Sequence, residues 1–384
     1  MPGVRTGGAE LDLLCLAVRP KPDLTRIRDL LRKGVDHPFL IRLAEGHGVR
    51  PQLFRCLDEL SWESVPGSER RSLELFRQQH LVRTLTLSSE LRRLAASFDV
   101  KEIPFVTFKG PALAIALYGD LAHREYNDID VLVPEHRLDD AEDVVASLGY
   151  RNSQGERAFR RAFLAHLQQH AFERADGEGA IDLHWALGGT YVRFPLKAAD
   201  VWNDLHRISI GDHDIPTVAG ANLALLLAGH GTKEVWKLLK WVGDFALMID
   251  RHRDLDWSDI HRRARAQGCG DAILLGCGVA RELLEVAVPG ELADLVAKSE
   301  RVGARTASVI SRMREGLQPL GQTETFADLG LCDRRLDRIK GTLKLIFTPT
   351  PGDYAALKLP PALWGAYYAT RPFRLAFKAV AGTG

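Results

Sequence analysis

Acidic and apolar residues alternate over a short stretch of the chain, and this alternation constrains the local fold more than any other feature. The stretch is NDIDVLV at 127–133. Successive side chains of a β-strand point to opposite faces, so Asp128 and Asp130 are predicted to share one face while Ile129 points to the core. Two carboxylates held so close need a counter-ion. Mg²⁺ is commonly bound by one or two carboxylates together with substrate phosphates, so the pair predicts a metal-assisted site for phosphoryl chemistry.

A strand, a tight turn and a helix are predicted directly before the acidic stretch. IPFVTF at 103–108 is rich in β-forming residues. It leads into Lys109-Gly110-Pro111, where glycine permits turn geometry closed to other residues and proline suits a helix start. The Lys109 ammonium and the backbone amides at Gly110 therefore predict an anion site for a triphosphate. Arg124, in the loop that follows, is predicted to bind phosphate oxygens in a bidentate way.

A third acidic residue lies in a second predicted strand. AIDLHWAL at 180–187 places Asp182 between two apolar residues, and the preceding AFERADGEGA predicts a strand and a hairpin turn. His184 falls on the same face as Asp182, about 6 to 7 Å further along the strand. Asp182 is therefore a candidate third carboxylate and His184 a candidate neighbour. The alternatives are an acid at a hairpin edge and a hydrogen-bonded structural histidine.

A long amphipathic helix is predicted over residues 221–251. One face is apolar, and the other carries His230, Lys233, Lys237, Lys240, Trp241 and Asp244 at steps of three and four. One interpretation of the second face is a solvated surface. The other places the lysines against phosphates and stacks Trp241 on a base. The candidate nucleotide-binding residues on this face are His230, Lys233, Lys240, Trp241 and Asp244.

The segments described so far carry a family resemblance. The chain resembles the polymerase-β-type nucleotidyltransferase superfamily, and within it a bacterial family of uncharacterised nucleotidyltransferases found near exopolysaccharide and peptide-tailoring genes. The matching segments are FKGPALAIALYGDLAHREYNDIDVLV, IDLHWAL, LLLAGHGTKEVWKLLKWVGDFALMI and LPPALWGAYYATRPFRL, which span most of residues 100–375. The resemblance implies a small mixed sheet that holds three carboxylates between helices. It also implies handling of a nucleoside triphosphate (NTP) that depends on Mg²⁺ or Mn²⁺.

The expected fold class is mixed α+β, in three parts. We predict an N-terminal helical subdomain over 1–99, a nucleotidyltransferase α/β core with a small mixed sheet over 100–190, and a mainly helical C-terminal subdomain over 191–384. A linker is predicted over 211–220. The tail LPPALWGAYYATRPFRLAFKAV interleaves aromatic and basic residues, and it either packs on the chain or binds a surface.

Composition narrows the classes of partner. The chain has 384 residues, of which 46% are hydrophobic, and can bury a sizeable core. Its net charge of +1 argues against nucleic acid, because binding a phosphate backbone usually needs a basic excess. Five scattered cysteines without metal-ligand spacing favour a reducing cytoplasm. We expect no signal peptide and no membrane span, and no pattern specifies an oligomer.

The predicted reaction is transfer of a nucleotidyl group from an NTP to a hydroxyl or phosphate of a small molecule, sugar or peptide. Asp128, Asp130 and Asp182 would be both the catalytic and the metal-binding residues. Two alternatives remain. A glycosyl or sugar-phosphate transferase would hold a nucleotide-sugar through the metal, and the Lys-Gly-Pro turn, where the superfamily has Gly-Gly or Gly-Ser, keeps this alternative open. A non-catalytic nucleotide-binding module would bind Mg·NTP without transfer.

Overall fold

The computed structural model describes residues 8–152, 156–174, 176–177, 179–188, 193–316 and 334–381. Cys332 lies outside the described residues, as do positions 175 and 178 of the predicted hairpin turn. The N-terminal part is helical, as predicted. Its helices are α1 Gly8–Val18, α2 Leu24–Lys33, α3 His37–His47, α4 Arg50–Glu59 and the long α5 Gly67–Val100.

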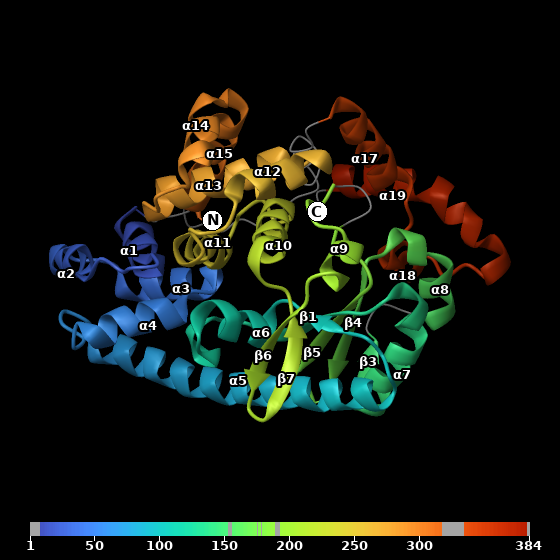
Figure 1. The fold of residues 1–384 in the computed structure, drawn as a ribbon, viewed down its shortest axis with the longest axis horizontal. Helices are drawn as coiled ribbons and strands as arrows, with labels where there is room; N and C mark the ends of the chain where they lie inside the picture. The colour runs from blue at the N-terminus through green and yellow to red at the C-terminus, as the bar shows by residue number, and fades with distance from the viewer. Residues whose placement is uncertain are drawn as a thin grey trace.

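A seven-stranded mixed sheet forms the centre of the described chain (Figure 1). Its strands are β1 Val106–Thr107, β2 Asp128–Leu132, β3 Tyr150–Asn152, β4 Gln169–Arg174, β5 Ala180–His184, β6 His206–Ile210 and β7 His213–Thr217. They lie in the order β3-β4-β5-β2-β1-β7-β6. β2 pairs in parallel with β5 and β1 with β7, and the other pairs are antiparallel. The predicted α+β class is confirmed.

Helices account for most of the remaining described residues. They are α6 Gly110–Leu113, α7 Leu138–Ser147, α8 Arg157–Ala162, α9 Ala198–Trp202, α10 Gly220–Lys233, α11 Leu239–Arg251, α12 Trp257–Ala266, α13 Gly270–Leu284, α14 Gly290–Lys298, α15 Glu300–Glu315, α17 Arg335–Phe347, α18 Pro351–Ala356 and α19 Tyr367–Ala381. No described helix is both long enough and apolar enough to cross a membrane.

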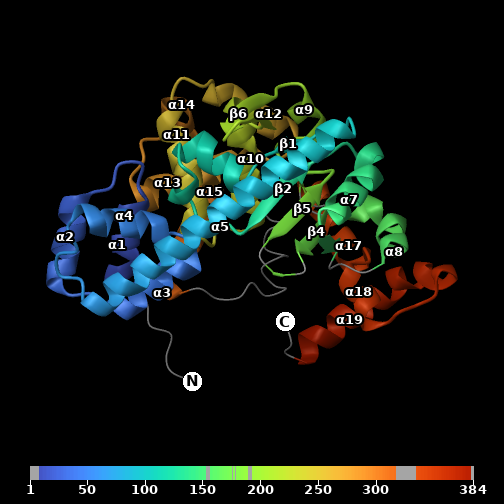
Figure 2. The ribbon, with the colours of Figure 1, turned by 90° about the horizontal axis from the view of Figure 1, so that it is seen from below.

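Each face of the sheet packs against its own set of helices. Ile129 and Val131 of β2 belong to a core shared with Leu87 and Leu91 of α5, which runs beneath the sheet (Figures 1 and 2). Leu132, on the opposite face, belongs to the core built with α10 and α11. Strand alternation therefore directs the acidic side chains of β2 toward the C-terminal helices.

Two strands follow residue 190, where the predicted α/β core ends. Gly211, with φ of +65°, turns β6 into β7, so the predicted linker over 211–220 is wrong. Thr217 of β7 pairs with Thr107 of β1, and its hydroxyl donates to the Thr107 carbonyl at 2.8 Å. The hairpin thereby completes the sheet that the acidic strands belong to. The division into three subdomains stays a prediction.

The single helix predicted over 221–251 is two helices, α10 and α11. The break follows from the burial of Trp236, which is 0% exposed. Val235 and Trp236 adopt left-handed φ angles of 53° and 52°, which reverse the chain. The indole then lies directly over Gly231, where a Cβ atom would stand 2.6 Å from the ring. Tertiary packing of one large side chain thus outweighs the helical periodicity.

Candidate active site

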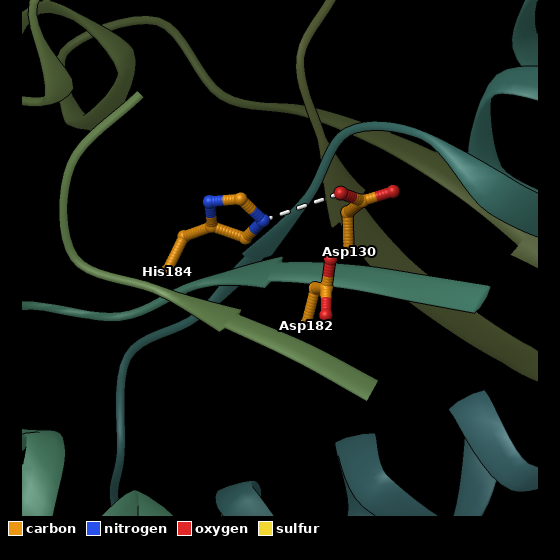
Figure 3. A group of neighbouring side chains, drawn as sticks. All are labelled: Asp130, Asp182 and His184. Carbon is orange, nitrogen blue, oxygen red and sulfur yellow. Dashed lines mark hydrogen bonds and ion pairs between the residues drawn. The ribbon is translucent and has the colours of Figure 1, made fainter. Parts of the chain in front are cut away.

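The parallel pairing of β2 with β5 brings the predicted acidic residues together. Asp130 lies opposite Asp182 in the register, and Leu132 lies opposite His184. Asp128, two residues before Asp130, shares its face of the sheet. One ligand atom from each of Asp130, Asp182 and His184 fits within 4.8 Å of the other two (Figure 3). The two strands therefore assemble a compact acidic site.

Asp130 is the most deeply enclosed of these acids, at 2% exposed. Its Oδ1 accepts from Lys109 Nζ at 3.2 Å. The same oxygen contacts His184 Nε2 at 3.2 Å (Figure 3). Burial alone would raise the pKa of Asp130, but the Lys109 and His184 contacts outweigh it and hold the pKa below its ordinary value. Asp130 therefore stays ionised at the centre of the site.

The two flanking carboxyl groups show the opposite shift. Burial, with the charges of Asp130 and Asp128 added, raises the pKa of Asp182 to about 7. Burial and the neighbouring Asp130 likewise raise the pKa of Asp128. The three carboxylates repel one another, and a bound cation would offset this repulsion.

The turn before the site fits the prediction at Gly110. This residue has φ of +54°, and a Cβ there would lie 2.5 Å from the Asp128 carbonyl oxygen. The turn can therefore approach β2 closely only with glycine. The predicted helix is less regular, because α6 gives way to a π-helical turn, Ala114–Tyr118, that ends at Gly119. The predicted amide anion site stays a prediction.

Arg124 and Asp244, both predicted to meet the nucleotide, contact each other. The Arg124 guanidinium donates three hydrogen bonds of 2.9 to 3.1 Å to the two Asp244 oxygens. Tyr118 donates a fourth to Asp244 at 2.7 Å. Both charged side chains are buried, at 4% and 2% exposed. The pair ties the loop before β2 to α11, and its predicted nucleotide contacts stay a prediction.

Two lysines face the acids without an ion-pair partner in the described part of the chain. Lys233 ends α10 and Lys240 lies in the first turn of α11. Burial lowers the pKa of each ammonium. Asp130 and Asp182 are among the charges that act on Lys233, and Asp128 is among those that act on Lys240. Partly buried cations beside a cluster of acids form a surface suited to an anion.

The remaining predicted residues lie nearby. His230 packs edge-on against Trp241, with ring centroids 5.2 Å apart, and burial lowers the pKa of His230 well below its ordinary value. Lys237 Nζ lies over the Trp241 ring, 5.6 Å from its centroid. The stacking of Trp241 on a base stays a prediction. The sequence did not single out Gln169, whose amide donates to Asp182 Oδ2 at 2.7 Å. The antiparallel hairpin of β4 and β5 was the signal that places it there.

Comparison with known proteins identifies the family of the chain. A family model described as uncharacterised nucleotidyltransferase matches residues 33–285. No curated protein matches the chain. A solution structure of the antibiotic-resistance factor ANT(2'')-Ia is 15% identical, with 47% of this chain and 91% of that chain covered and a TM-score of 0.35. A crystal structure of ANT(2'')-Ia in complex with adenylyl-2''-tobramycin is 15% identical, with 59% and 99% covered and a TM-score of 0.26.

Proposed function

We propose, for a chain that belongs to the uncharacterised nucleotidyltransferase family, that it moves a nucleotidyl group from an NTP to a hydroxyl or phosphate of an acceptor, with Mg²⁺ as cofactor. The observation that carries this proposal is the group of Asp128, Asp130 and Asp182 on one face of β2 and β5. The pKa values of Asp128 and Asp182, raised first by burial and then by the neighbouring carboxylates, support it, since buried acids side by side favour a bound cation.

The residues present fit a divalent cation. Asp130 and Asp182 would hold it through oxygen atoms, which Mg²⁺ prefers, and His184 through a nitrogen that Mn²⁺ also accepts. Asp128, on the same face of β2, would add a further oxygen. Bound there, the ion would neutralise charge on the phosphates of the NTP.

The lysines supply the phosphate side of the proposed site. Lys233 and Lys240 form no close ion pair among the described residues, although Glu234 acts on Lys233 and Asp244 on Lys240, whereas Lys109 is engaged by Asp130. A triphosphate placed between the acids and these lysines would meet cations on its other side. Positioning and charge neutralisation supply most of the rate in phosphoryl transfer.

Asp182 is the residue we assign to the acceptor. Gln169 donates to its Oδ2 at 2.7 Å, which orients the carboxyl group as a proton acceptor. The acceptor oxygen would form a bond to the α-phosphorus as the bond to pyrophosphate breaks. The hydroxyl proton would pass to Asp182 and then to solvent.

The products decide between the proposed reaction and its alternatives. With Mg²⁺, an NTP and a pool of candidate acceptors, we expect release of pyrophosphate and formation of a nucleotidylated acceptor. Neither product should form when EDTA is added. Release of a nucleoside diphosphate from a nucleotide-sugar would instead establish the sugar-transferase alternative. Binding of Mg·NTP in calorimetry, with no transfer to any acceptor, would establish a binding module.

The buried thiols of Cys15, Cys56 and Cys277 suit the cytoplasm that we propose as the location of the protein.

Replacing Lys233 by methionine is expected to weaken Mg·ATP binding about tenfold, because one charged contact to a phosphate is lost. The free energy of unfolding should not fall, since the ammonium has no ion-pair partner in the described chain and burial disfavours its charge. Calorimetry and urea denaturation measure the two quantities. Lys298→Met, at an exposed position of α14, is the control and should change neither. Unchanged ATP affinity in Lys233→Met would remove this lysine from the phosphate side.

A further inference from the structure

A second hollow lies beyond the end of β5, on the path that leads away from Asp182. It has a volume of about 550 Å³, which is in the range of small-molecule sites. It is lined by residues 186–188, by residues 193, 194 and 196–198, by Gln267 and by the first three turns of α17. Figure 1 shows where α17 lies in the fold. We call this hollow the basic cleft, for the charges described next.

Cations dominate the lining of the basic cleft. Arg193, Lys197, Lys340 and Lys344 border it, against the single acid Asp337. Arg193 donates to Asp337 at 2.8 Å, which neutralises that acid. The three lysines form no ion pair with any residue that the structure describes. All three are exposed, and they border one concave surface from two separate segments. A bound anion would relieve their mutual repulsion.

The basic cleft lies close to the acidic site, both along the chain and through the packing of one side chain, Phe194. Ala186 lies four positions after Asp182, and four extended residues span at most about 14 Å. Phe194, which borders the cleft, packs against Gly188 on one side and Gly229 of α10 on the other. Gly229 directly precedes His230 of the candidate active site. The basic cleft and the acidic site are therefore neighbours at the end of β5.

We propose that the basic cleft binds the acceptor, and that the acceptor is a sugar-sized molecule carrying a phosphate or carboxylate. This inference rests on the proposed function, because it gives Asp182 a substrate hydroxyl to act on. The anionic group lies against Lys197, Lys340 and Lys344, and the hydroxyl points along β5 toward the acids. The NTP and the acceptor thus occupy separate sites.

Three probes and two variants test the inference on the full chain by calorimetry. The probes are glucose 6-phosphate, glucuronate and glucose, which present a phosphate, a carboxylate and no charge on similar frames. One or both anions should bind, more weakly at high salt, and glucose should not. The triple variant Lys197→Gln, Lys340→Gln, Lys344→Gln should bind the anion about tenfold more weakly. The matched variant Lys21→Gln, Lys101→Gln, Lys298→Gln, at exposed positions elsewhere, should bind it like wild type.

The same titrations separate failure of the inference from failure of the proposed function. Equal binding of glucose and both anions, or an unchanged affinity in the cleft variant, would overturn the inference. Competition between the anion and Mg·ATP would do the same, since the two sites would then coincide. The cleft variant should retain wild-type affinity for Mg·ATP. Absence of Mg·ATP binding in wild type would instead refute the proposed function.

Discussion

Asp130→Asn is expected to lower nucleotidyl transfer about a thousandfold or more while leaving the chain folded. Asp130 is the acid whose pKa is held low, so it carries the permanent negative charge at the centre of the site. Asparagine keeps the shape and one oxygen, which can still accept from Lys109 and contact His184. The variant therefore loses charge more than packing. Pyrophosphate release measures the effect, and circular dichroism with urea denaturation checks the fold.

A control in the same sheet makes the Asp130 result specific. Asp214 lies on β7, is exposed, and accepts a hydrogen bond from Ser209 at 2.7 Å. Asp214→Asn removes the same charge far from the acids, so transfer should remain at the wild-type rate. A folded Asp130→Asn protein that transfers at the wild-type rate would show that the metal assignment is wrong. Loss of activity in both variants would indicate a general effect of net charge.

The parts of the site that sequence predicts well are local. Strand alternation places Asp128 and Asp130 on one face, and the same rule pairs Asp182 with His184, as the structure has them. Gly110 was also readable, because a sharp turn before a strand favours glycine. The register between β2 and β5 was not readable. Asp130 pairs with Asp182, which is more than 50 positions away in the sequence, and no local pattern fixes such a pairing.

The features that local sequence patterns did not indicate share a cause in long-range packing. Trp236 breaks the predicted helix only because Gly231 leaves room for its ring. Arg124 and Asp244 are 120 residues apart, so neither position indicates that the other neutralises it. A charged residue in a loop and one on an amphipathic helix each suggest a ligand when considered alone. Burial of both, visible only in three dimensions, turns them into an ion pair.

Asp244→Ala is expected to lower the free energy of unfolding by about 3–5 kcal/mol, because it leaves the Arg124 guanidinium buried without its counter-charge. Tyr118 would lose its acceptor as well. Urea denaturation at neutral pH measures the change. Asp250→Ala is the matched control on the same helix: Asp250 pairs with the exposed Arg253, and loss of that pair should cost less than about 1 kcal/mol.

The double variant Arg124→Met, Asp244→Leu distinguishes a positioning pair from a phosphate contact. Removing both charges should restore most of the stability lost in Asp244→Ala, since well-packed apolar side chains often replace a buried ion pair at little cost. If the pair only holds the loop before β2 against α11, the refolded double variant should bind Mg·ATP with nearly wild-type affinity. If Arg124 contacts phosphate, affinity should fall about tenfold even at recovered stability. An unfolding free energy for Asp244→Ala within about 1 kcal/mol of wild type would contradict the buried pair itself.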